Sequence, residues 1–439
     1  MGKTQSISNC QLKKLDDKTN FFFEHHTVIE GFPEGIAALR KEDIPVQQCF
    51  KRSDFRYQNV LTIDSADCKD MDDAVYVAKT FNGYFVAVHI ADVAYYVPYG
   101  SVLGGIACDR ASSIYLPDRV VPMLPKILSN DLCSLNPGVD RYTLSVLINL
   151  DDLGNVLSSK VEKGVIRSRV KGIYSEVNQL FKSKKDKKLM YKYGSVYQEL
   201  RVMKSLYKIL RGKRERAGAT IEDSNKPKIT FGADGIELTP IKDGIAENMI
   251  EELMVLANSV IANYLCDHDL PAIFRVQEEK NDLAAYQSVR SHHAELALEG
   301  YCHFTSPIRR NADLVIHQII SMYLNNVSSA EIKRQFEEPL PEICDRITRR
   351  SRTIKDIQNN CERFCYGLYF KAHPQEQYFG KIINFNANGN PIIHMDLYNI
   401  NVIGEMMENM KLGDSYVFTV SFSENHNRLY ARDLMRLAA

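Results

Sequence analysis

A dense run of aspartates between two apolar, strand-like segments is the feature that most constrains this chain. Five aspartates fall within residues 63–74, which follow apolar residues 60–63 and precede apolar residues 74–78. Carboxylates a few ångströms apart repel one another, so a shared proton or a cation must relieve the repulsion. Mg²⁺ prefers oxygen ligands and leaves room for substrate phosphates. Four residues have the spacing of metal ligands: Asp64, Asp70, Asp72 and Asp73. The cluster alone fits a solvated acidic turn equally well.

The composition is that of a globular protein with more than one domain. Its 439 residues predict two to three domains. The formal net charge is zero, so a site for a polyanion must be built locally. The ten cysteines include no Cys-x-x-Cys pair, which indicates free thiols in a reducing, cytoplasmic compartment. No apolar run approaches transmembrane length and the first residues are polar, so we expect neither a membrane span nor a secretory signal.

The pattern of apolar residues divides the chain into three regions and predicts an α+β protein. Residues 1–58 mix charges with turns and are expected to be an N-terminal extension or linker. Residues 59–370 begin with strands and loops. Helical periodicity follows over four stretches: about 174–218, 246–266, 305–325 and 340–370. Residues 371–439 contain short, closely spaced strands with turns, which is typical of a small barrel such as an OB-fold.

A second constellation lies at the start of the third of these helices. Ser306 is expected to be its N-cap, and Arg309, Asp313 and His317 then share one helical face. Arg309 and Arg310 lie in the first turn, where the helix dipole disfavours cations. An anion such as a phosphate would relieve that charge. The alternative, slightly favoured when this segment is considered alone, is an ordinary intrahelical pair between Arg309 and Asp313.

Five segments follow one another in a characteristic order: 63–74, 88–93, 128–135, 250–258 and 303–310. Together they resemble the RNB domain of the ribonuclease II and ribonuclease R family, over about residues 59 to 323. The resemblance implies an RNB catalytic domain, with a mixed sheet and helices around an RNA channel, followed by a C-terminal OB-fold barrel. It also implies a 3′-to-5′ hydrolytic exoribonuclease that releases nucleoside 5′-monophosphates from single-stranded RNA.

The resemblance also assigns roles to individual residues. The four spaced aspartates match active-site aspartates and would hold one or two Mg²⁺ ions, with Mn²⁺ as the alternative metal. Asp67 is interpreted as a bystander. Arg309 matches an arginine that clamps the scissile phosphate, a task that suits a guanidinium fork. Asp72 and Arg309 are therefore the predicted catalytic residues.

Further residues are predicted to contact RNA beside Arg309. Tyr115 matches an aromatic that stacks on bases, and Tyr174 and Glu251 match residues that position the terminal nucleotide. The register leaves Glu252 as an alternative to Glu251. Simpler roles remain open for all of these: a tyrosine in the core or at a rim, and a solvated glutamate on a helix.

Two features depart from the family pattern. The residues ahead of position 59 are too few for the two cold-shock-like barrels that members generally carry, which predicts a weaker grip on RNA. The aromatic that would sandwich bases against Tyr115 falls near Ile221. This clamp is therefore expected to be weak.

The sequence thus predicts a cytoplasmic, Mg²⁺-dependent exoribonuclease whose partner is single-stranded RNA with a free 3′ end. It is expected to be a monomer or to form only weak complexes. One alternative is a catalytically impaired RNA-binding or regulatory protein on the same fold. A second is an unrelated Mg²⁺ phosphohydrolase of small substrates.

Overall fold

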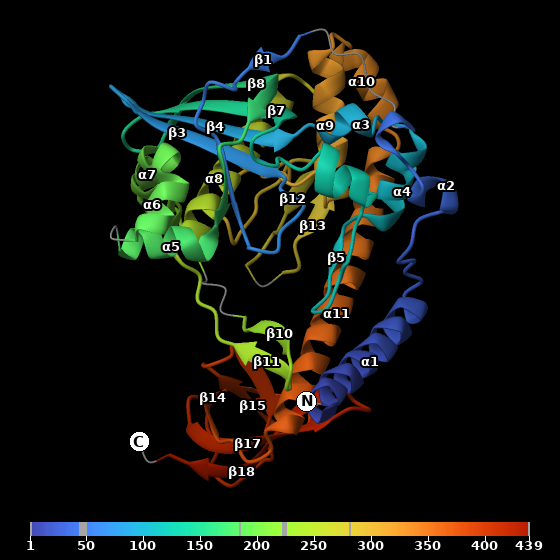
Figure 1. The fold of residues 1–439 in the computed structure, drawn as a ribbon, viewed down its shortest axis with the longest axis vertical. Coiled ribbons are helices and arrows are strands. Elements are labelled where there is room, and N and C mark those ends of the chain that lie inside the picture. Colours follow the sequence, from blue (N-terminus) through green and yellow to red (C-terminus); the bar gives the residue numbers. More distant parts are fainter. Residues whose placement is uncertain (1, 44–50, 184–185, 222–225, 281, 438–439) are drawn as a thin grey trace.

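A seven-stranded mixed sheet forms the upper part of the structure (Figure 1). The computed structural model describes residues 2–43, 51–183, 186–221, 226–280 and 282–437. In sheet order the strands are β1 (Ser53–Asp54), β8 (Val156–Arg167), β7 (Asp140–Leu150), β4 (Gly83–Ala91), β3 (Asp73–Thr80), β2 (Leu61–Asp64) and β9 (Val170–Ile173). The β1–β8 and β2–β9 pairs are parallel, and the other neighbours are antiparallel. The predicted mixed sheet is confirmed.

Apolar, largely β-branched residues explain the centre of this sheet. Side chains of this kind pack well on a pleated surface. β4 is buried at eight of its nine positions, as expected for a strand covered on both faces. The β3 and β4 residues at most 1% exposed include Val75, Val77, Val86, Val88 and Ile90. These two buried strands therefore form a rigid support for the residues at their ends.

A group of helices shares the core of the sheet. They are α5 (Tyr174–Lys182), α6 (Lys187–Tyr193), the turn η3 (Gly194–Val196), α7 (Tyr197–Arg216) and α8 (Ile245–Asp267). Leu180, Leu200 and Met203 from this group are at most 1% exposed. The helical stretches predicted near 174–218 and 246–266 therefore correspond to real helices.

One helix among the described residues, α8, is long and apolar enough to cross a membrane by length and composition alone. From the sequence, no apolar run of this length is expected. In the structure, 61% of the apolar window of α8 is buried inside the fold. Burial of this extent is typical of a core helix, and it explains why the segment is so apolar.

Further helices and hairpins complete the described fold. The helices are α3 (Val93–Tyr96), α4 (Val102–Arg110), the π-helical turn η2 (Ile127–Leu132), α9 (Asn311–Leu324) and α10 (Ser329–Phe336). The hairpins are β5 (Ile114–Tyr115) with β6 (Val120–Val121), β10 (Lys228–Gly232) with β11 (Gly235–Thr239), and β12 (Phe274–Val276) with β13 (Ala285–Gln287).

The long helix α11 (Leu340–Ala372) joins the sheet region to the C-terminal barrel, and α1 (Gly2–His25) lies beside it (Figure 1). With 33 residues, α11 is about 50 Å long. Leu15 of α1 is fully buried, and the Thr19 hydroxyl lies 3.5 Å from Sγ of Cys361 in α11. α1 is thus packed into the core that α11 shares with the barrel. The β10–β11 hairpin contacts both α1 and α11 near the barrel (Figure 1).

Helix α1 is not predicted from the sequence, because residues 1–58 show no sustained periodicity. The signal is a short stripe at helical spacing, and its members are all buried: Leu15, Thr19, Phe22 and Phe23. The same region also holds two short elements, α2 (Glu34–Ala37) and η1 (Lys41–Asp43). Part of the expected linker is therefore an ordered helix.

A closed five-stranded barrel forms the C-terminal part, as predicted. Its order is β14 (Tyr378–Phe385), β15 (Pro391–Met395), β16 (Ile400–Ile403), β18 (Arg428–Arg436) and β17 (Ser415–Ser423). α11 approaches β17 closely at Gly367, where an added Cβ would lie 2.4 Å from the ring of Phe422. Only glycine permits this contact, so Gly367 fixes how the barrel docks on α11.

Candidate active site

Seven of the eight residues predicted for the site line one pocket of about 500 Å³. They are Asp64, Asp70, Asp72, Asp73, Tyr115, Tyr174 and Arg309. Asp64 ends β2 and Asp73 begins β3, so the loop 65–72 between these antiparallel strands carries the other two aspartates. The structure therefore brings the acidic segment and the arginine segment together.

The hydroxyl of Ser134 holds this acidic loop in place. Ser134 Oγ accepts a hydrogen bond from the Met71 amide at 3.2 Å and donates one to the carbonyl oxygen of Lys69 at 2.8 Å. The Leu135 amide also donates to the Met71 carbonyl at 3.0 Å. Segment 128–135, one of the five segments behind the resemblance, thus positions the loop.

Asp72 links the two constellations directly. Its Oδ1 accepts a hydrogen bond from the Ile308 amide at 2.7 Å, and its Oδ2 lies 3.5 Å from Arg309 Nε. Asp72 is only 3% exposed, and burial raises the pKa of its carboxyl well above the ordinary value. Oδ2 is buried without a hydrogen-bond partner among the described residues. Such a carboxylate is costly unless a cation faces it.

Asp64 and Asp73 have pKa values that their surroundings raise above the ordinary value. Burial, reinforced by Asp64, raises the pKa of Asp73 to about 8. Burial, with a smaller contribution from Asp70, raises the pKa of Asp64 to about 6. Arg309 acts in the opposite direction on both groups but does not outweigh burial. A cation in the pocket would favour the ionised form of both.

The donor chemistry of the pocket suits a hard cation, but its side chains do not form a closed ligand set. Buried oxygens without hydrogen-bond partners remain on Asp64 and Asp72. Within the described ranges, however, no three His, Cys, Asp or Glu side chains lie close enough together to hold a metal ion. Asp70 instead accepts hydrogen bonds from the Tyr115 hydroxyl at 2.7 Å and from Cys68 Sγ at 3.6 Å.

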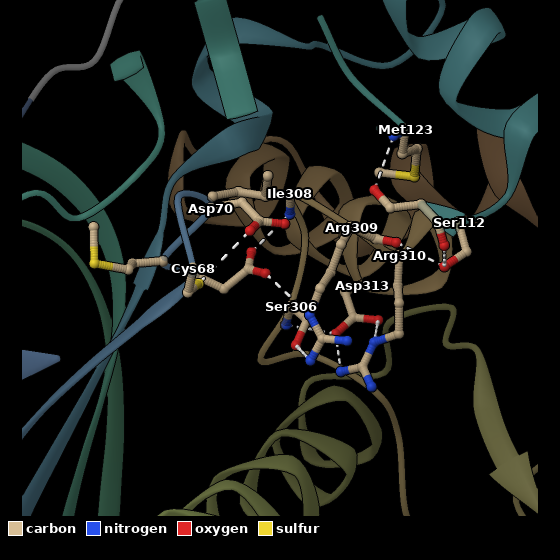
Figure 2. A network of polar contacts seen from close by, with 12 residues as sticks. Cys68, Asp70, Ser112, Met123, Ser306, Ile308, Arg309, Arg310 and Asp313 are labelled. Atoms are coloured by element: carbon tan, nitrogen blue, oxygen red, sulfur yellow. Dashed lines mark hydrogen bonds and ion pairs between the residues drawn. The ribbon is translucent and has the colours of Figure 1, made fainter. Parts of the chain in front are cut away.

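Arg309 lies in a turn before α9 and not in its first turn, which corrects the predicted helix start. α9 begins at Asn311 with Arg310 as N-cap residue, so Ser306 is not the N-cap. The Asp313 carboxylate explains the difference, because it accepts the Ser306 amide at 2.7 Å and both ends of the Arg310 fork at 2.7 and 2.9 Å (Figure 2). The proposed Arg309–Asp313 pair is therefore replaced by Arg310–Asp313.

The freed side chain of Arg309 faces the pocket. Arg309 Nη2 donates to Ser306 Oγ at 2.9 Å, and the side chain is 41% exposed. Figure 2 shows it beside Arg310. His317, in contrast, is fully buried: it stacks on Phe304 and donates from Nε2 to the Phe304 carbonyl at 2.9 Å. His317 is a core residue and shares no face with Arg309.

Two tyrosines reach the pocket from different elements. Tyr115 comes from the β5–β6 hairpin, whose backbone is tied to α11 by a 3.0 Å bond from Gln358 Nε2 to the Tyr115 carbonyl. Tyr174 follows β9, and parallel pairing sets Ile173 opposite Asp64. Burial raises the pKa of both phenols, so each hydroxyl is a hydrogen-bond donor at neutral pH. Their contacts with RNA stay predictions.

Glu251 is the predicted site residue that the structure does not bring to the pocket. Its half-exposed side chain pairs with Arg214 at 3.0 Å, and buried Glu252 pairs with the same Nη2 at 2.9 Å. Glu247, one turn earlier in α8, acts electrostatically on Tyr174 and accepts the Gly244 amide at 2.9 Å. The Gly-x-x-Glu spacing at this helix start is the sequence signal for that capping contact, and Glu247 does not line the pocket.

The acidic loop also supplies pocket residues that the sequence analysis passes over. Ser65, Asp67 and Cys68 line the pocket, so Asp67 is not outside it, although its exposed carboxylate lies 3.9 Å from Lys228 Nζ. Lys171 Nζ donates to the Cys68 carbonyl at 2.5 Å and so fixes this part of the loop. Leu116 and Val120 lie beside Tyr115. The predicted clamp partner position, Ile221, does not line the pocket.

Comparison with known proteins places this fold and pocket in one family. The RNB domain family matches residues 52–285 and 282–326. Ribonuclease R 1 of Lactococcus lactis is 31% identical over 422 residues, which cover 82% of this chain and 51% of the relative. Ribonuclease R of Thermotoga maritima is 34% identical over 394 residues, 74% of this chain and 54% of the relative. The chain therefore belongs to the RNB domain family, and it spans about half the length of these curated relatives.

Solved structures share the fold at lower identity. The apo form of Mycoplasma genitalium RNase R superposes with a TM-score of 0.83 at 23% identity, covering 95% of this chain and 77% of that one. Yeast Ssd1, described as a pseudonuclease, has a TM-score of 0.68 at 16% identity over 94% of this chain and 58% of its own. The fold is thus used by proteins with and without nuclease activity, so activity must be argued from the site.

Proposed function

We propose that this protein is a metal-dependent 3′-to-5′ exoribonuclease that degrades single-stranded RNA to nucleoside 5′-monophosphates. The observation that carries the proposal is the joining of Asp72 to the Ile308–Arg309 turn across one acidic pocket. The acidic residues of this pocket are suited to bind a metal ion that contacts a phosphodiester. The partly exposed guanidinium beside them is suited to stabilise negative charge on the phosphate. Mg²⁺ is the proposed metal and Mn²⁺ the alternative.

The four aspartates would hold the metal through carboxylate oxygens. Bound there, Mg²⁺ would supply Lewis-acid polarisation of the phosphoryl oxygen and a more acidic attacking water. Arg309 would bind a non-bridging oxygen of the scissile phosphate and stabilise the charge that develops on it. Asp72 would keep Arg309 in position, because the same carboxylate also holds the Ile308 amide.

Tyrosines at the rim would orient the 3′-terminal nucleotide. The Tyr115 and Tyr174 rings border the acidic residues, and both hydroxyls are protonated donors. Stacking and backbone contacts carry little sequence information, so the enzyme would tolerate any base. A pocket that receives one chain end explains why cleavage would proceed from the 3′ end.

The substrate, compartment and assembly state extend this proposal. The Mycoplasma genitalium protein has been solved with ribose-methylated single-stranded RNA and with double-stranded RNA. We propose single-stranded RNA with a free 3′ end as substrate here, a cytoplasmic location, and a monomeric state or weak complexes. Residues 59–370 would be the catalytic domain and 371–439 the RNA-binding OB-fold domain.

The second candidate is a non-catalytic RNA-binding protein on the same fold. The likeness to a pseudonuclease favours considering it. The retained aspartates and Arg309 favour the enzyme. Incubation of 5′-labelled single-stranded RNA with Mg²⁺ should produce a ladder that shortens from the 3′ end together with nucleoside 5′-monophosphates, and EDTA should stop it. Binding without product in Mg²⁺ or Mn²⁺ would favour the second candidate.

The same assay distinguishes the proposed exoribonuclease from a phosphohydrolase of small substrates. The preparation would be given small phosphate esters in parallel with RNA. We expect monophosphate release from RNA and none from the esters. Hydrolysis of the esters alone would refute the exoribonuclease proposal.

A further inference from the structure

Arg275 is a partly buried cation in the β12–β13 hairpin. It lies in β12 directly opposite Tyr286 of β13, and its guanidinium carbon is 4.6 Å from the centre of the Tyr286 ring. Among the residues that the structure describes, none accepts a hydrogen bond from this guanidinium or forms an ion pair with it. Burial lowers the pKa of Arg275, and Arg310 and Arg352 lower it further.

The surroundings of Arg275 are held rigidly. The Arg275 amide donates to the Tyr301 carbonyl at 2.8 Å, and the Tyr286 amide donates to Thr348 Oγ1 of α11 at 2.9 Å. The Tyr286 hydroxyl lies 2.8 Å from His303 Nδ1. The β12–β13 hairpin is thus fastened to α11 and to the segment that leads into the Arg309 turn. Stacking on Tyr286 orients the guanidinium but does not neutralise its charge.

Positive charge dominates this region. Both oxygens of Asp313 are taken by Arg310, so this carboxylate leaves nothing for Arg275. Burial, together with Arg310, Arg275 and Arg309 in that order, holds the pKa of His303 well below its usual range. His303 is therefore neutral and adds no further charge. Arg352 on the exposed side of α11 has no ion-pair partner within the described ranges.

We propose that Arg275 and Arg352 form a phosphate-binding subsite for the RNA strand next to the catalytic pocket. The inference rests on the proposed function, because RNA must be the molecule that enters. A partly buried guanidinium without an acid calls for an anionic ligand, and its fork matches phosphate oxygens. Arg309 would hold the scissile phosphate, while Arg275 and Arg352 would hold a phosphate farther along the strand.

Salt-dependent RNA binding tests this subsite. Fluorescence anisotropy with labelled single-stranded RNA in EDTA measures affinity without cleavage. Arg275→Met should weaken binding about tenfold at low salt, and the slope of log Kd against log salt concentration should fall by about 0.7, the value for one phosphate on a single strand. Arg352→Met should lower the slope similarly. Arg275→Lys should keep the slope, because it keeps the charge.

A matched control uses another arginine of α11. Arg346 is paired with Asp109 at 3.2 Å and Glu342 at 3.3 Å, so Arg346→Met should leave RNA affinity and salt slope unchanged. Thermal unfolding checks that each variant is folded. If Arg275→Met does not fold, the other two variants still test the subsite. A lower salt slope in Arg275→Lys would contradict it, and so would an unchanged salt slope in Arg352→Met.

Neutral linkages locate the phosphate. A methylphosphonate is placed at one linkage at a time along the RNA. At one linkage near the 3′ end it should weaken binding to the wild-type protein. The same replacement should not change the affinity of Arg275→Met for RNA. Suppose that folded Arg275→Met binds RNA with the affinity and salt slope of the wild type, while the wild type degrades RNA. This result would overturn the subsite and leave the proposed function unaffected. A wild type that neither binds nor degrades RNA would overturn both.

Discussion

The half-buried carboxylates of Asp64 and Asp73 predict an inverted pH dependence of stability for the metal-free protein. The pKa of Asp73 is about 8 and that of Asp64 about 6, both above the value of 3.8 for the unfolded chain. The folded state therefore holds protons that the unfolded state releases. The contribution of these groups is complete below about pH 4 and is lost as the pH rises through 6 and 8.

The magnitude follows from the shift of Asp73. One pKa unit corresponds to about 1.4 kcal/mol, so between pH 5 and pH 8 Asp73 should lower the free energy of unfolding by about 4 kcal/mol. Asp64 contributes less over this range and overlaps with Asp73, since the two groups repel each other. Asp73→Asn removes the titrating group and should flatten the profile. Mg²⁺ should stabilise the wild type more at pH 8 than at pH 5, because protons compete for the same oxygens.

Urea unfolding followed by circular dichroism measures this effect, since the chain has no tryptophan for fluorescence. Wild type and Asp73→Asn are compared in EDTA from pH 5 to pH 8. Asp151→Asn is the matched control: Asn155 holds the pKa of this exposed group below the ordinary value, so its contribution is constant over the range. Parallel profiles for wild type and Asp73→Asn would refute the reasoning.

Three substitutions test other parts of the structure. Asp72→Asn should abolish cleavage but keep folding and RNA binding, because an amide oxygen still accepts the Ile308 amide; turnover at the wild-type rate in the labelled-RNA assay would exclude Asp72 from catalysis. Arg309→Ala should lower kcat roughly 10²-fold with little change in stability, and an unchanged kcat would contradict its role. Gly367→Ala should destabilise the protein by about 1–3 kcal/mol in urea unfolding, because the new methyl group meets Phe422; no change would mean that α11 and the barrel adjust freely.

The features that the sequence predicted correctly are those that local pattern determines. The barrel and most helices follow from apolar periodicity and turn residues, whereas the mixed sheet was implied by the family resemblance. The acidic loop follows from charge density between two strands. The place of Arg309 in the same pocket follows from the resemblance alone, because 236 residues separate Asp72 from Ile308 and no local rule relates them.

The structure differs from the prediction where a residue distant in the sequence, or a weak sequence signal, determines the local contacts. Ser306 has the sequence signature of an N-cap, but Asp313 binds its amide and Arg310 instead, and the helix starts later. Glu251 was assigned by register; in the structure it pairs with Arg214 and does not line the pocket, and its contact with RNA stays a prediction. In both cases the sequence offers several chemically equivalent residues for one contact, and only the tertiary structure shows which residue makes it.

The Asp72–Ile308 bond couples the geometry of the acidic pocket to the folding of the chain. A single carboxylate ends the acidic loop, accepts the amide before Arg309 and lies 3.5 Å from the guanidinium. Its burial is unfavourable alone, but the bond helps to fix the turn that presents Arg309, in which the amides of Arg309 and Arg310 donate to the Ser306 carbonyl at 3.3 and 2.9 Å. The site therefore forms only when the β2–β3 loop and the approach to α9 meet. The unfavourable burial of this carboxylate is thus offset by a contact between segments far apart in the chain.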